Sequence, residues 1–367
     1  MLEKDSVWDA IAFSMMIISA RAFFHNRFQD CFGSAPPHEA FISWYLSRIC
    51  SGSFETQNSD LPELDPMIRF IEKRNCKSIS VSHVVRLFEE DVLSFMRDYR
   101  ANIRSDWLFS YFKGSSVNVD YPQESLSYEI PNTSLCTLSE SYKGACFALD
   151  VSIMFMKYDS LFGFEMGEGR GWHLSVPDQF YSIIESEFDV DCELFGSPVN
   201  RRASRYFSLF SSDCVFGSLG DFFKSPVNLS SFLSLVGSPA RLTVEANPPF
   251  QPLLMMRFAR RLTQLLSDAD GARYDFFCVC IVPDWPKCEP IEFLRQSPFL
   301  IHSISLEKGE HKYKPGWADV RVYEADPGYW KNTETLILLL GSMSARARYN
   351  VDEDLERRIR QSWKPNN

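Results

Sequence analysis

The sequence predicts an α/β fold, in which a mostly parallel sheet with an antiparallel last strand is preceded by a helical domain. Three observations support this prediction. Apolar residues recur at helical spacing through the first half of the chain. After about residue 187, short apolar runs bounded by turn residues alternate with helical segments, which is typical of parallel strands joined by crossover helices. The last apolar run follows a long irregular connection, as an antiparallel final strand would.

Residues 1–187 are expected to form the helical domain. The apolar spacing predicts four helices there, at 6–24, 41–49, 80–96 and 147–158. Ser6 is suited to cap the first of these helices. The stretch from Gly114 to Gly144 is rich in Ser, Asn, Pro and Tyr, so we expect a long surface loop or an inter-helix linker.

Residues 188–349 are expected to form the sheet domain, and 45% hydrophobic residues in the chain supply enough apolar surface for its core. The apolar runs predict six strands, at 192–195, 214–216, 242–244, 275–282, 301–306 and 335–340. Residues 350–367 form a charged tail, for which we expect a short exposed helix.

The net charge of −10 argues against a protein coated for non-specific nucleic-acid binding. The charge is unevenly distributed along the chain. Residues 1–240 hold 20 Lys and Arg against 31 Asp and Glu, which gives −11, whereas residues 241–367 hold 18 against 17, which gives +1. The C-terminal part is therefore the better place to look for an anionic ligand.

The cysteines and the N-terminal segment exclude further classes. The 10 cysteines are scattered, and Cys278-Val-Cys280 lies in an apolar run, so we expect buried free thiols and predict no metal site. The uncharged stretch from Ala10 to Ala20 is too short to span a bilayer. Asp5 and Asp9 precede it, which does not fit a signal peptide. We expect a soluble, intracellular protein that does not bind membranes.

A short motif, Asn247-Pro248-Pro249-Phe250, carries the clearest chemical signal. It follows the apolar run Leu242–Ala246 and precedes a stretch, 253–266, whose apolar residues fall on one helical face. The motif is therefore expected at the carboxyl end of a strand and before a helix. Ligands bind at this edge in open α/β sheets.

The residue types of this motif suit the methylation of an exocyclic amino group. An adenine amino nitrogen is a poor nucleophile because its lone pair is delocalised into the ring. If the Asn247 side-chain oxygen and the Pro248 carbonyl each accept one of its N–H bonds, the nitrogen is steered toward tetrahedral geometry and its lone pair points at a sulfonium methyl. Phe250 is able to stack on the base, a contact worth about 1–3 kcal/mol. The competing interpretation is a plain Pro-Pro turn after a strand.

Two turns ahead of the motif are candidates for close approach to a cofactor. Leu194–Pro198 ends one apolar run and Cys214–Gly220 ends another, and small residues at strand ends let the backbone come near a ligand. Neither turn is a Gly-x-Gly-x-x-Gly fingerprint, and each by itself is an ordinary turn. Their order before the motif matches the first, second and fourth strands of a methyltransferase sheet.

Together these segments resemble the phosphorylated-CTD-interacting-factor family of cap-specific adenosine N6-methyltransferases. The resemblance extends over roughly residues 145 to 345, and it rests on the order and spacing of the segments 194–200, 215–220 and 245–250, with further matches at 157–163, 176–180, 281–285 and 310–314. It implies a Rossmann-like S-adenosylmethionine methyltransferase domain packed with a helical domain. The implied reaction is N6-methylation of the first transcribed adenosine, typically already 2′-O-methylated, beside the m7G cap of mRNA. Formation of the dimethyl product is left open.

The resemblance also implies roles for individual residues. The catalytic residues would be Asn247, Pro248, Pro249 and Phe250. S-adenosylmethionine would be lined by Phe195, Gly196, Ser197, Pro198, Asn200, Gly217, Ser218 and Glu245. Support of the sheet end is the alternative role for Glu245.

Two later segments are candidate substrate contacts. Asp284 and Trp285 follow the strand next to the catalytic one, so the indole is able to stack on a base or on the cap, and a structural tryptophan is the alternative. The second segment combines positive charge with an aromatic ring, which suits a triphosphate bridge and a base, and it consists of His311, Lys312, Tyr313 and Lys314. A solvated charged loop is the alternative there.

Animal members of the family begin with a WW module that reads phosphorylated polymerase tails, and no tryptophan pair with the required spacing occurs at this N-terminus. We therefore expect a chain that lacks the WW domain and is not recruited by that route. The expected protein is a monomer that acts on m7G-capped RNA, in the nucleus rather than the cytoplasm. Two alternatives remain open, namely an adenine methyltransferase for internal RNA or DNA and a catalytically silent cap- or RNA-binding scaffold.

Overall fold

The computed structural model describes residues 2–32, 35–36, 40–42, 44–45, 87–88, 90–96, 98, 109–113, 116–121, 124–129, 132–162, 173–314 and 334–364. The chain divides into two compact units. One unit consists of Met1–Ile130 and Cys146–Arg170, and the other consists of Pro131–Ala145 and Gly171–Asn367.

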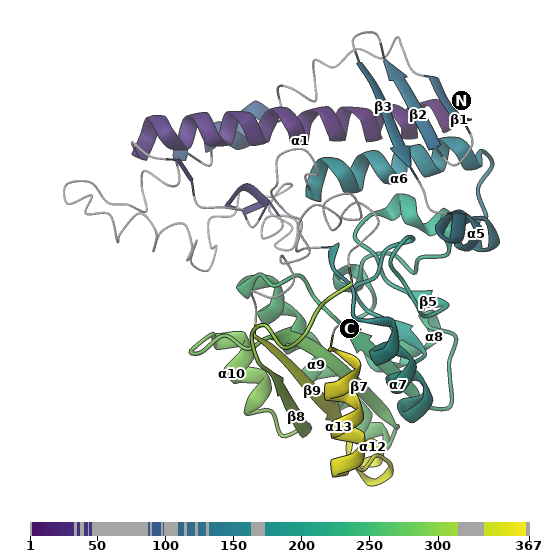
Figure 1. Ribbon diagram of the computed structural model, residues 1–367, viewed down its shortest axis with the longest axis vertical. Coiled ribbons are helices and arrows are strands. Elements are labelled where there is room, and N and C mark those ends of the chain that lie inside the picture. The colour runs from purple at the N-terminus through teal and green to yellow at the C-terminus, as the bar shows by residue number, and fades with distance from the viewer. Residues whose placement is uncertain are drawn as a thin grey trace. The chain divides into compact units, whose positions relative to one another are not determined.

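The first unit contains two long helices, α1 (Leu2–Phe32) and α6 (Phe147–Phe162), which lie side by side (Figure 1). The ring of Phe24 is fully buried at the centre of an aromatic cluster that includes Phe28, Phe41, Trp44 and Phe88. The guanidinium of Arg21 donates hydrogen bonds to the carbonyls of Ser160 and Leu161 near the end of α6. These bonds pair the buried guanidinium with two carbonyls in the last turn of α6.

The first unit also contains an antiparallel sheet, made of β1 (Phe109–Lys113), β2 (Ser116–Tyr121) and β3 (Glu124–Glu129). The prediction of a loop over 114–144 is therefore wrong, since β2, β3 and α5 (Asn132–Ser141) lie there. Residues 116–121 read Ser-Val-Asn-Val-Asp-Tyr, an alternation of polar and apolar residues. Such alternation is the signal of a strand. The content of Ser, Asn, Pro and Tyr, from which the loop was predicted, does not reveal it.

The predicted helices at 6–24 and 147–158 are confirmed, and both extend further than expected. Parts of the other two predicted helices are helical where the structure describes them, at 40–42, 44–45, 87–88 and 90–96. The remainder of those two segments lies outside the described residues. None of the described helices is both long enough and apolar enough to cross a bilayer.

The second unit is built on a six-stranded sheet with the order β5-β4-β6-β7-β9-β8. Figure 1 labels β5, β7, β8 and β9 of this sheet. Its strands are β4 (Cys192–Glu193), β5 (Arg205–Tyr206), β6 (Leu242–Ala246), β7 (Phe276–Pro283), β8 (Leu300–Leu306) and β9 (Thr335–Gly341). The first four strands in this order pair in parallel, and β9 runs antiparallel to both of its neighbours. The predicted mostly parallel sheet with an antiparallel last strand is confirmed.

The run at 214–216 does not form the second strand of the sheet, so that prediction is wrong. It belongs to the 3₁₀ helix η2 (Ser211–Phe216), and the strand beside β4 is β5 instead. Polar residues begin η2, and Gly217 ends it at a φ of 90°, where its N–H bonds to the carbonyls of Asp213 and Cys214. Three apolar residues are too short a run to distinguish a strand from a helical turn.

Strand β7 is buried along its whole length and divides the core into two layers. Its even-numbered residues pack against α8 (Leu229–Leu235), α9 (Pro252–Ala272) and α10 (Glu289–Arg295). Its odd-numbered residues pack against α7 (Asp178–Phe188), α12 (Met343–Arg348) and α13 (Glu353–Ser362). Helices therefore cover both faces of the sheet, which explains why β7 reads as a continuous apolar run.

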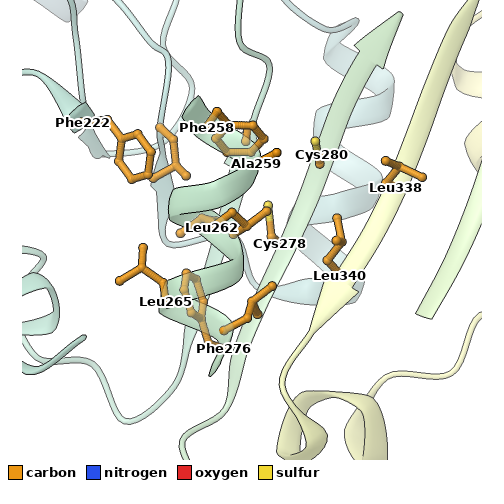
Figure 2. Packing of buried hydrophobic residues seen from close by; sticks show 14 of the residues in the cluster. Phe222, Phe258, Ala259, Leu262, Leu265, Phe276, Cys278, Cys280, Leu338 and Leu340 are labelled. Atoms are coloured by element: carbon orange, nitrogen blue, oxygen red, sulfur yellow. The ribbon is translucent and has the colours of Figure 1, made fainter. Parts of the chain in front are cut away.

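Figure 2 shows the contact between α9 and the sheet in detail. The buried face of α9 meets alternate side chains of β7 and β9, and the labelled residues include Phe258, Ala259, Leu262, Leu265, Cys278, Cys280, Leu338 and Leu340. The two cysteines are buried free thiols, as the sequence predicted.

The charged tail forms the helix α13, as expected, but it is not simply exposed. Its polar face is turned to solvent, whereas Leu355, Ile359 and the adjoining Trp363 are buried in the layer on the odd-numbered face of β7. The spacing of these three residues is four, which places them on one side of the helix.

We predict that Leu262→Ala lowers the free energy of unfolding by about 2–5 kcal/mol, because it opens a cavity between α9 and the sheet. The matched control is Leu235→Ala, since that leucine is 37% exposed, and it should cost less than about 1 kcal/mol. Urea unfolding followed by circular dichroism measures both. Equal losses in the two variants would contradict this description of the core.

Candidate active site

Three loops of the second unit follow the carboxyl ends of adjacent parallel strands. Residues 194–200 follow β4, residues 247–250 follow β6, and residues 284–285 follow β7. Because these strands pair in parallel and in sequence across the sheet, their loops lie at the same edge. This edge is where open α/β sheets bind ligands.

Asn247 is the first residue of the loop after β6, and its side-chain amide has a defined orientation. Its Nδ2 donates a hydrogen bond of 3.1 Å to the backbone carbonyl of Leu174. Since the nitrogen faces Leu174, the amide oxygen points the other way and is the acceptor that the group presents. Asn247 itself is half-buried.

Helix α9 begins immediately after the motif. Gln251 is buried, and its side-chain oxygen accepts a hydrogen bond of 2.6 Å from the N–H of Leu254, which caps the helix. Pro252 occupies the first turn, where no backbone donor is needed. The backbone N–H of Gln251 also bonds to the carbonyl of Pro249 at 2.7 Å. The motif is thus held between a strand end and a capped helix start.

The ring of Phe250 lies where the two layers of the core meet, since it packs against both. It contacts Trp285 at 6.3 Å and Tyr313 at 6.1 Å between ring centroids, and both contacts are edge-on. The sequence-predicted residues Phe250, Trp285 and Tyr313 are therefore brought together. These three rings form an aromatic cluster, and Phe250 follows Asn247 by three residues in the chain.

The turn after β4 is tightly built around Gly196. Its N–H donates to the carbonyl of Phe207 at 2.9 Å. A Cβ at Gly196 would lie 3.3 Å from the side chain of Tyr206 and 3.4 Å from the carboxylate of Glu193, so no larger residue fits without movement. Pro198 is buried, and the ring of Phe195 packs into the core against Phe222, Phe223 and Phe258.

The other two residues predicted in this turn, Ser197 and Asn200, bond to each other. The Asn200 side-chain oxygen accepts hydrogen bonds from the N–H and the hydroxyl of Ser197, at 2.7 and 2.8 Å. The hydroxyl of Ser197 also lies 2.9 Å from Nε2 of His173, a buried histidine that the sequence analysis did not select. Burial lowers the pKa of His173 to about 4, so its imidazole is neutral at physiological pH.

Two buried carboxyl groups, Glu193 and Glu245, are direct partners across β4 and β6. Glu193 accepts the backbone N–H groups of Arg202 and of Ala203, the latter at 2.5 Å. Burial raises the pKa of Glu193 to about 7, against the opposing effect of these hydrogen bonds. Burial and the neighbouring Glu193 raise the pKa of Glu245 well above its usual value. The pair therefore retains a proton at neutral pH.

Glu193 is not among the residues predicted from the sequence, although it is the last residue of β4 and precedes the glycine turn. An acidic residue inside a short apolar run was the available signal.

Gly217 and Ser218 hold the loop after β5 together. The hydroxyl of Ser218 lies 2.7 Å from that of Ser208 and accepts the N–H of Gly220 at 3.0 Å. Gly217 ends η2 with a left-handed backbone that favours glycine. Both residues thus have a clear structural role in shaping this loop.

Asp284 is engaged within the protein through both of its carboxylate oxygens. One oxygen forms an ion pair of 2.5 Å with Arg295 of α10, and the other accepts the hydroxyl of Ser305 at 2.7 Å. Asp284 therefore ties α10 and β8 to the end of β7.

His311 and Tyr313 converge on the hydroxyl of Thr335. Nε2 of His311 and the hydroxyl of Tyr313 each lie 2.8 Å from it, and Nδ1 of His311 lies 2.9 Å from the carbonyl of Glu307. Because a carbonyl only accepts, Nδ1 carries the proton, so Thr335 donates to Nε2 and accepts from Tyr313. Burial lowers the pKa of His311, which keeps this arrangement neutral. The expected alternative of a solvated loop does not describe these two side chains.

The two lysines of the same segment differ. Lys314 pairs with Asp178 at 3.0 Å, and its backbone forms a β-bridge with Ser175. Lys312 is half-buried, and its backbone N–H bonds to the carbonyl of Trp363 at 3.0 Å.

A surface hollow of about 500 Å³ lies between α8 and α9, near Ser238 and Tyr274. These residues precede β6 and β7, so the hollow is at the amino edge of the sheet and not beside Asn247. Among the described residues, no group of three or more His, Cys, Asp and Glu is arranged to hold a metal ion.

Comparison with known proteins finds a matching family and named relatives, among them the two that follow. The family model described as phosphorylated CTD interacting factor 1 WW domain matches residues 131–316, just over half of the chain. The mRNA (2'-O-methyladenosine-N(6)-)-methyltransferase of Mus musculus is 31% identical over 167 residues, and the protein of that name from Homo sapiens is 30% identical over 166 residues. Each match covers 44% of this chain and 21% of the relative, so the similarity spans about a fifth of those proteins.

The prediction that the chain lacks the WW domain is wrong, because the matching family model is that of a WW domain. The expectation rested on the absence of one short tryptophan pattern at the N-terminus. The match instead covers residues 131–316. The expectation that recruitment to the polymerase tail fails for want of this domain loses its basis.

We predict that His173 makes the stability of the protein depend on pH. The pKa of His173 is about 4 in the fold and 6.5 in the unfolded chain, so protons favour the unfolded state as the pH falls through 6.5. The free energy of unfolding should drop by about 2 kcal/mol from this residue between pH 7.5 and pH 5.

The variant His173→Gln should lack this contribution. Glu193 titrates in the opposite direction but is common to both proteins, so the difference between their pH profiles isolates His173. Identical profiles of urea unfolding would refute the prediction.

Proposed function

The chain belongs to the family of the phosphorylated CTD interacting factor 1 WW domain, and we propose that it methylates N6 of the first transcribed adenosine beside the m7G cap of mRNA. The methyl donor in this proposal is S-adenosylmethionine. The two relatives are named as mRNA (2'-O-methyladenosine-N(6)-)-methyltransferases. The observation that carries the proposal is the hydrogen bond from Asn247 to Leu174, which leaves the amide oxygen as the acceptor.

The proposed chemistry follows from two acceptors and one ring. The oxygen of Asn247 and the carbonyl of Pro248 each accept an N–H of the adenine amino group, which draws its nitrogen toward tetrahedral geometry. The ring of Phe250, supported by Trp285 and Tyr313, holds the base. Such positioning needs no strong general base, and it supplies much of the rate of a displacement between two well-oriented partners.

The residues of the β4 edge fit the proposed cofactor. Gly196 leaves the backbone of this turn without a side chain, because a Cβ there would lie too close to Tyr206 and Glu193. The buried carboxyl groups of Glu193 and Glu245 make this edge receptive to a cation, and a bound cation would favour their ionised forms. When bound there, S-adenosylmethionine supplies the methyl group as an activated sulfonium. The sheet then serves as a Rossmann-like methyltransferase core.

For the RNA, we propose contacts through Trp285 and Lys312. Trp285 is partly buried beside Phe250 and offers an aromatic surface. Lys312 supplies a cation and directly precedes Tyr313, a member of the aromatic cluster, in the sequence. Asp284, His311 and Tyr313 act by holding these segments in place, through the contacts to Arg295 and Thr335. Lys314 has the same supporting role through Asp178.

We expect methyl transfer to an RNA that begins with m7G-capped 2′-O-methyladenosine and much weaker transfer to uncapped RNA or to DNA of the same sequence. Tritiated S-adenosylmethionine reports the transfer, and mass spectrometry of the released nucleosides reports the position and number of methyl groups. Equal activity on uncapped RNA or on DNA would contradict cap-specific methylation. It would instead support an adenine methyltransferase that acts on internal RNA or on DNA. Binding without transfer to any substrate would favour the silent scaffold.

We predict that Asn247→Ala lowers kcat by at least about a hundredfold, because the amino group loses an oriented acceptor. Binding of S-adenosylhomocysteine, measured by calorimetry, should stay near the wild-type value. Asn228→Ala is the matched control, since Asn228 caps α8 near the amino edge of the sheet. Activity of Asn247→Ala close to that of wild type would exclude the proposed role.

A further inference from the structure

The segment from His173 to Asp178 contacts the glycine turn after β4, the motif at 247–250 and the segment 311–314. It is not part of the motif or of the glycine turn, and it contributes no strand to the sheet of the second unit. The 173–178 segment nevertheless joins residues that lie far apart in the sequence, and each of its contacts has a specific polarity.

The first contact reaches the glycine turn. The hydroxyl of Ser197 has one proton, which it donates to the side-chain oxygen of Asn200 at 2.8 Å. The hydroxyl must therefore accept from Nε2 of His173 at 2.9 Å, which assigns the proton of the neutral imidazole to Nε2. His173 is a fixed donor to the turn that we assign to the cofactor.

The second contact reaches the motif through the next residue. The carbonyl of Leu174 accepts from Nδ2 of Asn247 at 3.1 Å. A backbone carbonyl is only an acceptor, so it orients the amide with the nitrogen toward Leu174 and the oxygen away from it. A carboxylate at 247 would instead place an anion against the carbonyl oxygen.

The third group of contacts anchors the rest of the segment. Ser175 and Lys314 exchange two backbone hydrogen bonds, at 2.9 and 2.8 Å. Asp178, at the start of α7, pairs with Lys314 and also with Arg202. The backbone N–H of Arg202 is in turn held by the buried Glu193. The segment is thus anchored on the C-terminal side of the two contacts that face the site.

We propose that the 173–178 segment is a positioning element that sets the polarity of the Asn247 amide and couples it to the cofactor turn through His173. In this role the Leu174 carbonyl requires a hydrogen-bond donor at position 247 and so selects asparagine over aspartate. The proposal rests on the proposed function, because it concerns the same site. His173 and Leu174 act through Ser197 and Asn247 and touch no reacting atom.

The selection by Leu174 is tested with Asn247→Asp. At pH 8 the carboxylate lacks a donor and faces the Leu174 carbonyl, so kcat should fall by about a hundredfold. As the pH falls to 5.5, the protonated acid regains a donor toward Leu174 and keeps its other oxygen as an acceptor, so the ratio of variant to wild-type kcat should rise. Glu193 and Glu245 titrate in both proteins, and His173, whose pKa is about 4, stays neutral over this range, so the ratio reports mainly on position 247. If the ratio of variant to wild-type kcat stays constant over this pH range, whatever its value, the selection of asparagine by Leu174 is refuted.

The coupling through His173 is tested with His173→Leu and His173→Gln. Leucine removes the donor to Ser197, whereas the glutamine amide places an N–H near the position of Nε2. Hydrogen exchange of peptides covering 194–203 and 245–252 should become about tenfold faster in both regions of His173→Leu and stay near wild type in His173→Gln. The control His302→Leu removes a histidine that bonds to Glu356 and should change neither region. Faster exchange at 194–203 alone, or no change in either region, overturns the coupling.

The kinetic readout follows the same pattern. His173→Leu should lower kcat with capped RNA by about tenfold with little change in the KM for RNA, and His173→Gln should restore it. A wild-type protein that methylates none of the substrates would refute the proposed function, whereas the exchange experiment, which uses no substrate, would still decide the role of the segment.

Discussion

The burial of β7 on both faces is the constraint on which the rest of the second unit depends. A strand enclosed by helices has no side chain free to meet a ligand along its length, so functional groups are confined to the strand ends and to the loops around them. The parallel pairing of β4, β6 and β7 then brings three such loops to one edge. The antiparallel β9 completes the buried core on the other side of β7, and its first residue, Thr335, lies at the same edge because it pairs with Pro283. The site is therefore a consequence of the sheet order rather than of any single motif.

Polar groups near this edge are arranged so that few of them carry a free charge. Glu193 and Glu245 are neighbours in a buried environment, so one ionised carboxylate disfavours the ionisation of the other. Asp284 shares its charge with Arg295, and Lys314 shares its charge with Asp178. An acidic pair that retains a proton can adjust its charge when a cation binds, which a permanently ionised pair in the same place could not do without a large desolvation cost.

Much of this arrangement could be predicted from the sequence, where long patterns decide the structure. The run at 276–283 and the amphipathic stretch after Pro252 are long enough to identify β7 and α9, and they locate Asn247 between a strand and a helix. The two-residue strand β5 could not be identified, because its pairing with β4 and not its own composition makes it a strand. The bond between Asn247 and Leu174 has no sequence signature, since it joins residues 73 positions apart through a backbone carbonyl. The contact of His311 has no sequence signature either, because its partner Thr335 lies 24 residues later in the chain.

The two buried histidines of this edge show what kind of catalyst the proposed enzyme would be. His173 carries its proton on Nε2 and His311 carries its proton on Nδ1, and in each case one oxygen acceptor determines the choice. Burial lowers the pKa of both, so neither gains a proton readily near neutral pH. A general base needs a pKa near the working pH and a free lone pair toward the substrate, and these imidazoles serve as fixed structural partners instead. Methyl transfer to an amino group suits such an edge, because its main requirement is an oriented lone pair. The positions of acceptors such as Asn247, rather than the movement of protons, would then determine the rate.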